Sequence, residues 1–435
     1  MSESLTNAAS PAHLVPTGTI GTPFTAGAMR VVLLGAGELA KELAIELQRL
    51  GGEVVAVGSY AAAPAMQVAD RGHVVDLLDP DVLLNVLAIE RPHVVIPVAG
   101  ALDPSVLGEI EDGGARVVPS ALATQMSLDR EIMRRLLAED LGLPTPKYEF
   151  ASSYPALVEA LAEVGLPAVV KSVRSSAGSG HTVVRSVADA ETAWETANSG
   201  GWLSADEHGD HEPRVIVEEY VPFDAELVVF VVRAWAPNDG EAAFACPAIQ
   251  VIENNGFVAA WTPAVGPGGV SADVAERAQA LALESISALP GWGVFAVEFL
   301  VEFLVEGDRI LVSEVSPRPA GAGFVTMAAW DTSVFAMEAR AVLGLPVSPP
   351  VAYTSAAARA LWVTGVGKPS FVDLDQALAT FPNSRALLFG KPNTDQRRAV
   401  AMVLATGPDA ETARQQADGA AATINVVLDD GRNAP

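Results

Sequence analysis

The sequence predicts an α/β protein: an N-terminal doubly wound parallel sheet, a central α+β region and a small C-terminal β-rich domain. Over the first 128 residues, short apolar runs of strand type alternate with segments of helical periodicity, which is typical of a parallel sheet. From residue 214 onward the strand-type runs become longer and adjacent, as in an antiparallel sheet. A length of 435 residues leaves room for two or three such domains.

The composition excludes several classes of protein. Half of the residues are hydrophobic, so wholesale disorder is excluded. The 53 acidic residues outnumber the 27 basic ones, and the net charge of −26 repels nucleic acid and anionic lipid alike. We therefore expect neither a nucleic-acid nor a membrane partner. The single cysteine, Cys246, excludes an internal disulfide and a thiolate metal cluster, and fits a cytoplasmic protein.

The first domain is expected at residues 29–128, after a flexible polar tail at 1–28 that does not have the pattern of a signal peptide. Met29–Leu34 is an apolar run of buried-strand type, and Glu38–Leu50 has helical periodicity. Further strands and helices of the parallel sheet are expected at Glu53–Val57, Pro80–Ile89, His93–Val98, Pro104–Glu111 and Arg116–Val118.

The turn between the first strand and helix reads Gly35-x-Gly37-x-x-Ala40. Glycines let backbone N–H groups approach a phosphate or carboxylate at the positive end of a helix. A dinucleotide site would also need an acid after the second strand, but that strand ends in Gly58-Ser59. The pattern therefore disfavours NAD and leaves a substrate loop or a turn without ligand.

Proline-containing segments mark the remaining boundaries. Asp129–Leu141 has the pattern of an amphipathic helix and is followed by Gly142 and Pro144. A second boundary falls at Leu345-Pro346. We therefore expect a central domain at residues 129–345 and a C-terminal domain at 346–435.

A lysine at the base of a glycine loop is the first candidate ligand site. Pro167–Lys171 is a strand ending in lysine, Ser172–His181 is rich in serine and glycine, and His181–Arg185 is a second strand. Such a loop can fold over a triphosphate, and the lysine supplies charge to its oxygens. An ordinary hairpin with a solvated lysine is the alternative.

Two glutamates on apolar strands form the second candidate site. Glu302 and Glu314 lie six residues on either side of Asp308, so they are expected to face each other across a hairpin. Facing carboxylates repel unless a cation joins them, and Mg²⁺ prefers such oxygen ligands. Arg318, in Ser-Pro-Arg-Pro, would then place a guanidinium beside the metal. A duplicated Val-Glu-Phe-Leu also offers Glu298 as a ligand.

Glutamates that point to solvent on an edge hairpin are the alternative to this metal site. A zinc site is not expected, because the six histidines are scattered along the chain.

The loop, the acidic hairpin and the arginine segment, in this order, resemble the ATP-grasp enzymes. Within that class the chain resembles the formate-dependent phosphoribosylglycinamide formyltransferases over residues 17–427, and related carboxyaminoimidazole synthetases are separated less decisively. The similar stretches are Gly35–Leu50, Tyr60–Val68, Arg214–Glu226, Val312–Pro319 and Leu388–Arg398.

The resemblance implies that ATP phosphorylates formate and that the amine of glycinamide ribonucleotide attacks the formyl phosphate, a step of purine biosynthesis. It implies ATP and Mg²⁺ as cofactors and a cytoplasmic homodimer. The implied ATP contacts are Arg130 and Lys171 at the phosphates, Ser176, Ala177, Gly178, Ser179, Gly180 and His181 in the covering loop, Glu218, Glu219, Tyr220 and Val221 at the adenine, and Glu226 at the ribose. The other implied site residues are Glu38, Leu39, Lys391, Arg397 and Arg398 at the nucleotide substrate, Glu302 and Glu314 at Mg²⁺, and Arg318 in catalysis.

Four departures from the family pattern concern the same sites. Ser179 stands where the family has a loop lysine, and Ser172 where it has a proline. Val98 and Gly321 replace a glutamate and an aspartate that contact the substrate. These changes leave two alternatives open: an ATP-grasp ligase for another acid or amine, and a nucleotide-binding protein without turnover.

Overall fold

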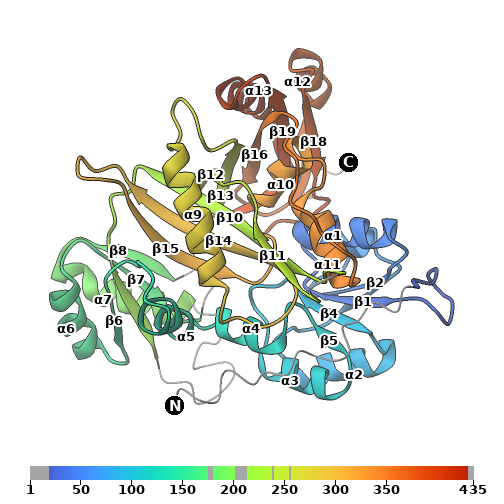
Figure 1. Ribbon diagram of the computed structural model, residues 1–435, viewed down its shortest axis with the longest axis horizontal. Coiled ribbons are helices and arrows are strands. Elements are labelled where there is room, and N and C mark those ends of the chain that lie inside the picture. The colour runs from blue at the N-terminus through green and yellow to red at the C-terminus, as the bar shows by residue number, and fades with distance from the viewer. Residues whose placement is uncertain (1–18, 175–179, 201–212, 238–239, 254–255, 430–435) are drawn as a thin grey trace.

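The computed structural model describes residues 19–174, 180–200, 213–237, 240–253 and 256–429. It confirms the predicted fold class, with a parallel sheet first in the chain and antiparallel sheets after it (Figure 1). In the described part of the chain, no helix is both long and apolar enough to cross a membrane.

The N-terminal sheet has five parallel strands in the order β3-β2-β1-β4-β5. All six residues of β2 are buried, as expected for a strand covered by helices on both faces. The strands and helices are β1 (Arg30–Leu34), α1 (Glu38–Arg49), β2 (Glu53–Gly58), β3 (Arg71–Val74), α2 (Pro80–Glu90), β4 (Val94–Pro97), α3 (Ser105–Asp112) and β5 (Arg116–Val117). Strand β3 was not predicted, because Arg-Gly-His-Val lacks an apolar run.

The predicted helix at Asp129–Leu141 is present but changes pitch midway. An α-helix, α5 (Arg130–Arg135), continues into a π-helical turn at Leu136–Asp140. The side chain of Asp129 caps its N-terminus by accepting from the backbone N–H groups of residues 131 and 132. The helix follows α4 (Ala121–Ser127) and leads into a four-stranded sheet.

This four-stranded sheet has the order β6-β9-β7-β8. Its strands are β6 (Tyr148–Ala151), β7 (Ala168–Ser172), β8 (His181–Val184) and β9 (Val215–Glu219), with α6 (Tyr154–Val164) and α7 (Ala190–Gly200) packed against it. The hairpin of β7 and β8 is antiparallel and places Lys171 opposite His181. The predicted strand–loop–strand unit is therefore confirmed in its two strands.

A nine-stranded sheet forms the centre of the molecule, in the order β15-β14-β10-β12-β13-β16-β19-β18 with β11 at the side of β10. The strands that precede residue 346 are β10 (Ala225–Ala234), β11 (Ala242–Ala245), β12 (Ile249–Glu253), β13 (Phe257–Thr262), β14 (Gly293–Glu302) and β15 (Arg309–Ser316). Helix α9 (Ala272–Ser285) packs on one face, and α10 (Gly323–Ala329) and α11 (Val334–Val342) pack on the other.

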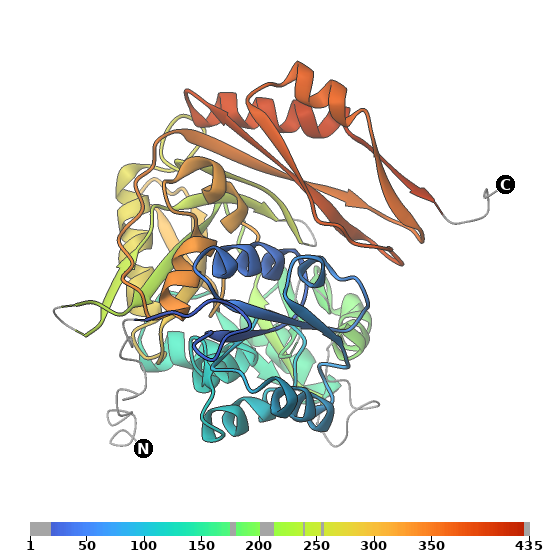
Figure 2. The ribbon, with the colours of Figure 1, turned by 90° about the vertical axis from the view of Figure 1, so that its right-hand side faces the viewer.

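The last part of the chain extends this same sheet. Strands β16 (Ser355–Val363), β18 (Ser384–Leu388) and β19 (Arg398–Gly407) continue it beyond β13. Strands β17 (Lys368–Val372) and β20 (Asn425–Asp429) form a separate pair. Figure 2 shows α12 (Leu374–Thr380) and α13 (Ala410–Thr423) covering these strands, so two helices accompany the predicted β-rich region.

Candidate active site

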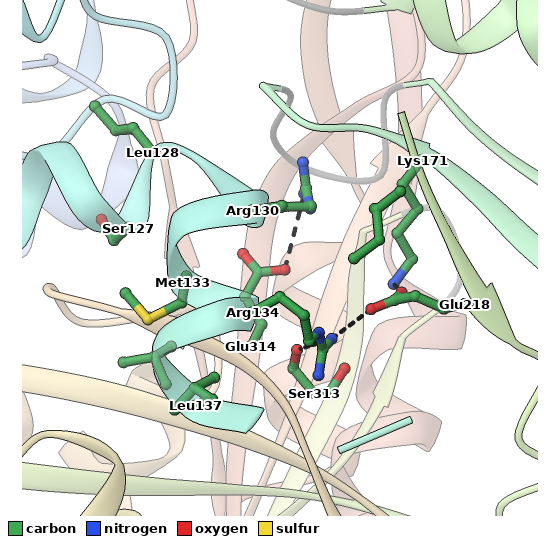
Figure 3. Close-up of a pocket in the computed structure, with 12 residues that line it drawn as sticks. Ser127, Leu128, Arg130, Met133, Arg134, Leu137, Lys171, Glu218, Ser313 and Glu314 are labelled. Carbon is green, nitrogen blue, oxygen red and sulfur yellow. Dashed lines mark hydrogen bonds and ion pairs between the residues drawn. The ribbon is translucent and has the colours of Figure 1, made fainter. Parts of the chain in front are cut away.

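A polar pocket lies where α5 meets the four-stranded sheet and β15 (Figure 3). It brings together Arg130 from α5, Lys171 from β7, Glu218 from β9 and Glu314 from β15. The remaining lining residues are Ser127, Leu128, Met133, Arg134, Leu137, Ile216, Ser313 and Val315. Side chains predicted from distant parts of the sequence thus meet in one place.

Glu218 is the electrostatic centre of this pocket. It is buried and forms ion pairs with Arg134 and, at 2.5 Å, with the Nζ of Lys171. Burial alone would raise the pKa of Glu218, but Lys171 and Arg134 outweigh it and lower that pKa to about 2. Arg134 also donates to the backbone oxygens of Val312 and Ser313, at 3.1 and 3.0 Å, which ties α5 to β15. Sequence reasoning missed Arg134, because its pattern is that of an ordinary helix residue.

Arg130 and His181 lie beside this ion-paired group. Arg130 donates to the backbone oxygen of Ser172 at 3.0 Å and pairs with Glu314 at 3.8 Å. Burial, with help from Lys171 and Arg130, lowers the pKa of His181 to about 3. The buried Nε2 of His181 has no hydrogen-bond partner among the described residues. Two cations and a neutral imidazole therefore lie close together.

The acidic hairpin differs from the prediction. Strand β14 places Glu298, not Glu302, opposite Glu314. Glu302 lies opposite Arg309 and forms an ion pair with it at 2.9 Å, and Arg309 also pairs with Glu219 at 2.6 Å. The expectation that Glu302 faces Glu314 is wrong, and Glu302 is instead part of a partly buried ion-pair group with Arg309 and Glu219.

The register of the hairpin explains this correction. Strand β14 continues through Glu302, and the connection runs from Phe303 to Asp308, so the turn is centred earlier than the sequence suggested. A shift in pairing next to Glu298 leaves Ser313 without a partner on β14, as in a β-bulge. The duplicated Val-Glu-Phe-Leu hid this, because each copy offers an equivalent glutamate.

Four carboxylates share the wall formed by β10, β12, β14 and β15. Burial, then Glu314 and Glu253, raise the pKa of Glu298 well above its ordinary value. Burial, then Glu226 and Glu314, raise the pKa of Glu253 to about 7. Glu226 accepts a hydrogen bond of 3.2 Å from the backbone N–H of Glu253. These carboxylates repel one another, and among the described residues no cluster of three or more such side chains is placed to hold one metal ion.

The other residues expected to contact ATP lie next to the ion-paired group around Glu218 and the wall of four carboxylates. Glu219, Tyr220 and Val221 follow Glu218 at the end of β9, and Val221 is buried. Gly180 precedes β8. The expected loop contacts Ser176, Ala177, Gly178 and Ser179 lie outside the described residues.

Arg318 follows β15 and sits close to the carboxylates. Burial lowers its pKa, while Glu314 and Glu298 act in the opposite direction. The predicted guanidinium next to the acidic hairpin is therefore in place.

A second charged group forms where α1 meets the C-terminal strands. Glu38, at the start of α1, pairs with the Nζ of the buried Lys391 at 3.0 Å. The guanidinium of Arg398 lies 5.4 Å from the ring centroid of Tyr60. Burial lowers the pKa of Lys391, which Glu38 opposes. The structure thus brings Glu38, Lys391 and Arg398 together across a sequence distance of more than 350 residues.

Arg397 takes a different direction from its neighbour. Its guanidinium stacks over the ring of Trp362, 4.0 Å from the centroid. Leu39 packs against the core under the nine-stranded sheet.

The turn before α1 requires glycine at position 35. Gly35 has a positive φ of 112°, and a Cβ added there would lie 2.5 Å from the backbone of Ala99.

Similarity to known proteins agrees with this arrangement. The family description "ATP-grasp domain" matches residues 136–335, and "PurT, C-terminal" matches residues 355–424. An N5-carboxyaminoimidazole ribonucleotide synthetase from Thermotoga maritima superposes with a TM-score of 0.76 over 92% of this chain and 100% of that one, at 23% identity, which speaks for the fold alone. The fold and the pocket define an ATP-grasp enzyme.

Relatives with higher sequence identity show to which family of ATP-grasp enzymes the chain is similar. The formate-dependent phosphoribosylglycinamide formyltransferases of Burkholderia pseudomallei and Burkholderia thailandensis are each 44% identical over 94% of this chain and 98% of their own length. The glycinamide-RNase-transformylase T structure from Mycobacterium tuberculosis has a TM-score of 0.73 at 30% identity, over 91% of this chain and 100% of that one. The chain belongs to the family of formate-dependent phosphoribosylglycinamide formyltransferases.

Proposed function

We propose that the protein uses ATP to formylate the amine of glycinamide ribonucleotide with formate, through a formyl phosphate, in purine biosynthesis. The observation that carries the proposal is a pocket lined by Lys171, Arg130 and Glu314, with Glu298 opposite Glu314 on the neighbouring strand. Phosphorylation is chemically required, because a carboxylate oxygen is a poor leaving group until it is made into a phosphate.

Within the pocket, Lys171 and Arg130 would bind ATP phosphates through charge-assisted hydrogen bonds. The ion pair with Glu218 holds the ammonium of Lys171 in position before the nucleotide arrives, which removes an ordering cost from binding. The segment Glu218–Val221 would contact the adenine, and Glu226 the ribose hydroxyls. Arg318 would stabilise negative charge on the transferred phosphoryl group.

Glu298 and Glu314 fit a divalent cation, because they lie opposite each other and the pKa of Glu298 is raised by burial and by its acidic neighbours. We therefore assign the two Mg²⁺ ligands to this pair in place of the earlier choice of Glu302 with Glu314. When bound, Mg²⁺ would neutralise charge on the β- and γ-phosphates.

The second charged group would bind the phosphorylated amine. Lys391 and Arg398 can hold a phosphate monoester through charge-assisted bonds, and Arg397 would contribute from its place over Trp362. Glu38 and Leu39 would contact the rest of the nucleotide. Glu38 also neutralises Lys391 when no phosphate is present.

Three further expectations stay predictions: a homodimer and a cytoplasmic location, which the resemblance implies, and domain boundaries after residues 28, 128 and 345, which the sequence pattern indicates. Sedimentation of the purified chain tests the first of them.

The decisive experiment measures ADP release with Mg²⁺, ATP and formate, with and without glycinamide ribonucleotide. We expect release that requires both formate and the nucleotide amine. Release only with another acid or amine would select a different ATP-grasp ligase, and nucleotide binding without turnover would select the binding protein. The first of these alternatives draws support from Gly321, where the structure places an aromatic ring in the space that an acidic side chain would need.

A further inference from the structure

The two charged groups of the proposed site are separated by an aromatic unit formed by Phe257 and Trp362. The backbone oxygen of Phe257, at the start of β13, accepts a hydrogen bond of 2.9 Å from the indole Nε1 of Trp362 on β16. Gly256 permits this approach, because a Cβ there would lie 2.8 Å from the Trp362 ring. Arg397 stacks on the same ring at 4.0 Å. The unit is therefore fixed from both sides.

Phe257 lies between the carboxylates and the cations. On one side it pairs across the β12–β13 hairpin with Glu253, which is electrostatically coupled to Glu298 and Glu314. On the other side its backbone oxygen holds Trp362, on which the guanidinium of Arg397 stacks. In the proposed function, a substrate with its phosphate at the cations and its amine near the carboxylates would therefore extend along this unit.

The ring of Phe257 also covers Gly321. A Cβ on residue 321 would lie 2.8 Å from Cγ of Phe257, and 3.0 and 3.1 Å from two further atoms of that side chain. Any longer side chain at position 321 would therefore have to displace the ring. Phe257 is only half-buried and packs against the edge of the core, so one face is left for a ligand.

We propose that Phe257 is a specificity-determining residue: its ring forms an apolar wall for the part of the substrate that joins the phosphate to the amine. The wall favours a phosphorylated amine whose connecting part is uncharged and presents a flat face, such as an amide or a heteroaromatic ring. A carboxylate at position 321 and this ring exclude each other. The proposal rests on the proposed function, because that function places the two ends of the substrate.

The test is calorimetric binding of glycinamide ribonucleotide and of ribose 5-phosphate to the full chain and its variants. Ribose 5-phosphate carries the phosphate without the glycinamide. F257A is expected to lower affinity for glycinamide ribonucleotide on the order of tenfold and to leave affinity for ribose 5-phosphate within about twofold. F303A removes an exposed phenylalanine from the β14–β15 connection and should change neither affinity. F257L keeps an apolar side chain and should lie between the parent and F257A.

Substitution of Gly321 gives a second test of the proposal. G321D should bind glycinamide ribonucleotide more weakly than the parent, and F257A/G321D should recover affinity relative to G321D. The inference is overturned if G321D alone binds more tightly, or if F257A affects both ligands equally or neither. It is also overturned if the parent binds the two ligands equally. If the parent lacks formate-dependent ADP release, the proposed function fails, while the affinity ratios still decide the role of Phe257.

Discussion

Two walls of the candidate active site bury charged side chains in opposite ways. On the wall formed by α5, β7 and β9, the carboxylate of Glu218 has Arg134 and Lys171 as partners, and its pKa falls to about 2. On the wall formed by β14 and its neighbours, Glu298 faces Glu314 and its pKa rises. Both glutamates lie on apolar strands, so burial itself does not distinguish them.

The opposite pKa shifts distinguish a carboxylate whose charge is neutralised by neighbouring cations from one whose charge is not neutralised by the chain itself. A buried carboxylate with two cationic partners is already stable and orders the groups around it. A carboxylate that faces other carboxylates destabilises the metal-free protein and gains from a bound cation. The chain's own cations therefore balance the charge of the first wall, whereas the proposed Mg²⁺ would balance the charge of the second.

The largest effect is expected from removing the charge of Glu298. E298Q should lower Mg²⁺-dependent ADP formation by at least about a hundredfold, because a ligand of the catalytic metal is lost. E302Q is the matched control on the same strand. Glu302 is paired with Arg309 and does not lie opposite Glu314, so its loss should leave turnover within roughly a few-fold of the parent.

Steady-state kinetics at several Mg²⁺ concentrations measures this contrast. An inactive E302Q with an active E298Q would restore the ligand choice made from the sequence and would show that the hairpin register changes in the loaded enzyme.

The next largest effect is expected on the wall formed by α5, β7 and β9, where Glu218 has cationic partners. K171A should weaken ATP binding on the order of tenfold to a hundredfold, because one charge-assisted contact to phosphate is lost. It should also lower the melting temperature, since Glu218 keeps Arg134 alone as partner. K147A removes an exposed lysine that bonds only the backbone oxygen of Glu163 among the described contacts, and should do neither.

Calorimetry with ATP and thermal unfolding of both variants give the two readouts. Unchanged ATP affinity in K171A would mean that Lys171 only neutralises Glu218 and does not contact ATP.

The fold was accessible from the sequence because its signals are local. The parallel sheet follows from apolar runs such as Met29–Leu34, which are buried on both faces and need no partner to be recognised. The joining of β16 and β19 to the central sheet was not accessible. It depends on pairing between strands about 100 residues apart, as between Ala260 and Ala358, which no local pattern encodes.

The site shows the same division. Lys171 and Arg318 were found from short motifs that fix their local structure. The choice between Glu298 and Glu302 failed because it depends on hairpin register, and the connection between β14 and β15 is centred earlier than the sequence pattern indicates. The covering of Gly321 by Phe257 depends on contact between separate strands, and only the structure shows it.

A smaller effect is expected at the phosphate of the amine substrate. R398A should raise KM for glycinamide ribonucleotide roughly tenfold, because a charge-assisted contact to the phosphate is lost. R397A should raise it less, since this guanidinium stacks on Trp362. The KM for ATP serves as the internal control and should stay unchanged in both variants. Equal effects of the two variants would show that Arg397 also reaches the phosphate, and no effect of R398A would remove the clamp from the mechanism.

The smallest effect tests the charge imbalance of the second wall directly, without turnover. The pKa of Glu298 in the folded protein is raised above its unfolded value of about 4.5. Below the unfolded pKa the carboxyl is protonated in both states and costs nothing. As pH rises from there toward the folded pKa, the unfolded state loses its proton first, so the free energy of unfolding of the parent falls, by about 1.4 kcal/mol for each unit by which the pKa is raised.

The glutamine of E298Q does not titrate. In the absence of divalent metal, E298Q should therefore be more stable than the parent at pH 8 and equal to it near pH 4.5. The matched variant E218Q should show the opposite sign, because the pKa of Glu218 is lowered and its stabilisation is present at neutral pH and lost as pH falls toward 2. Denaturant unfolding in EDTA measures the E298Q difference across pH 4.5–8, and the E218Q difference at neutral pH and again as pH falls from 4.5 toward 2. A loss of stability in E298Q at pH 8 would mean that this carboxylate already has a compensating partner, and the distinction between the two walls would then fail.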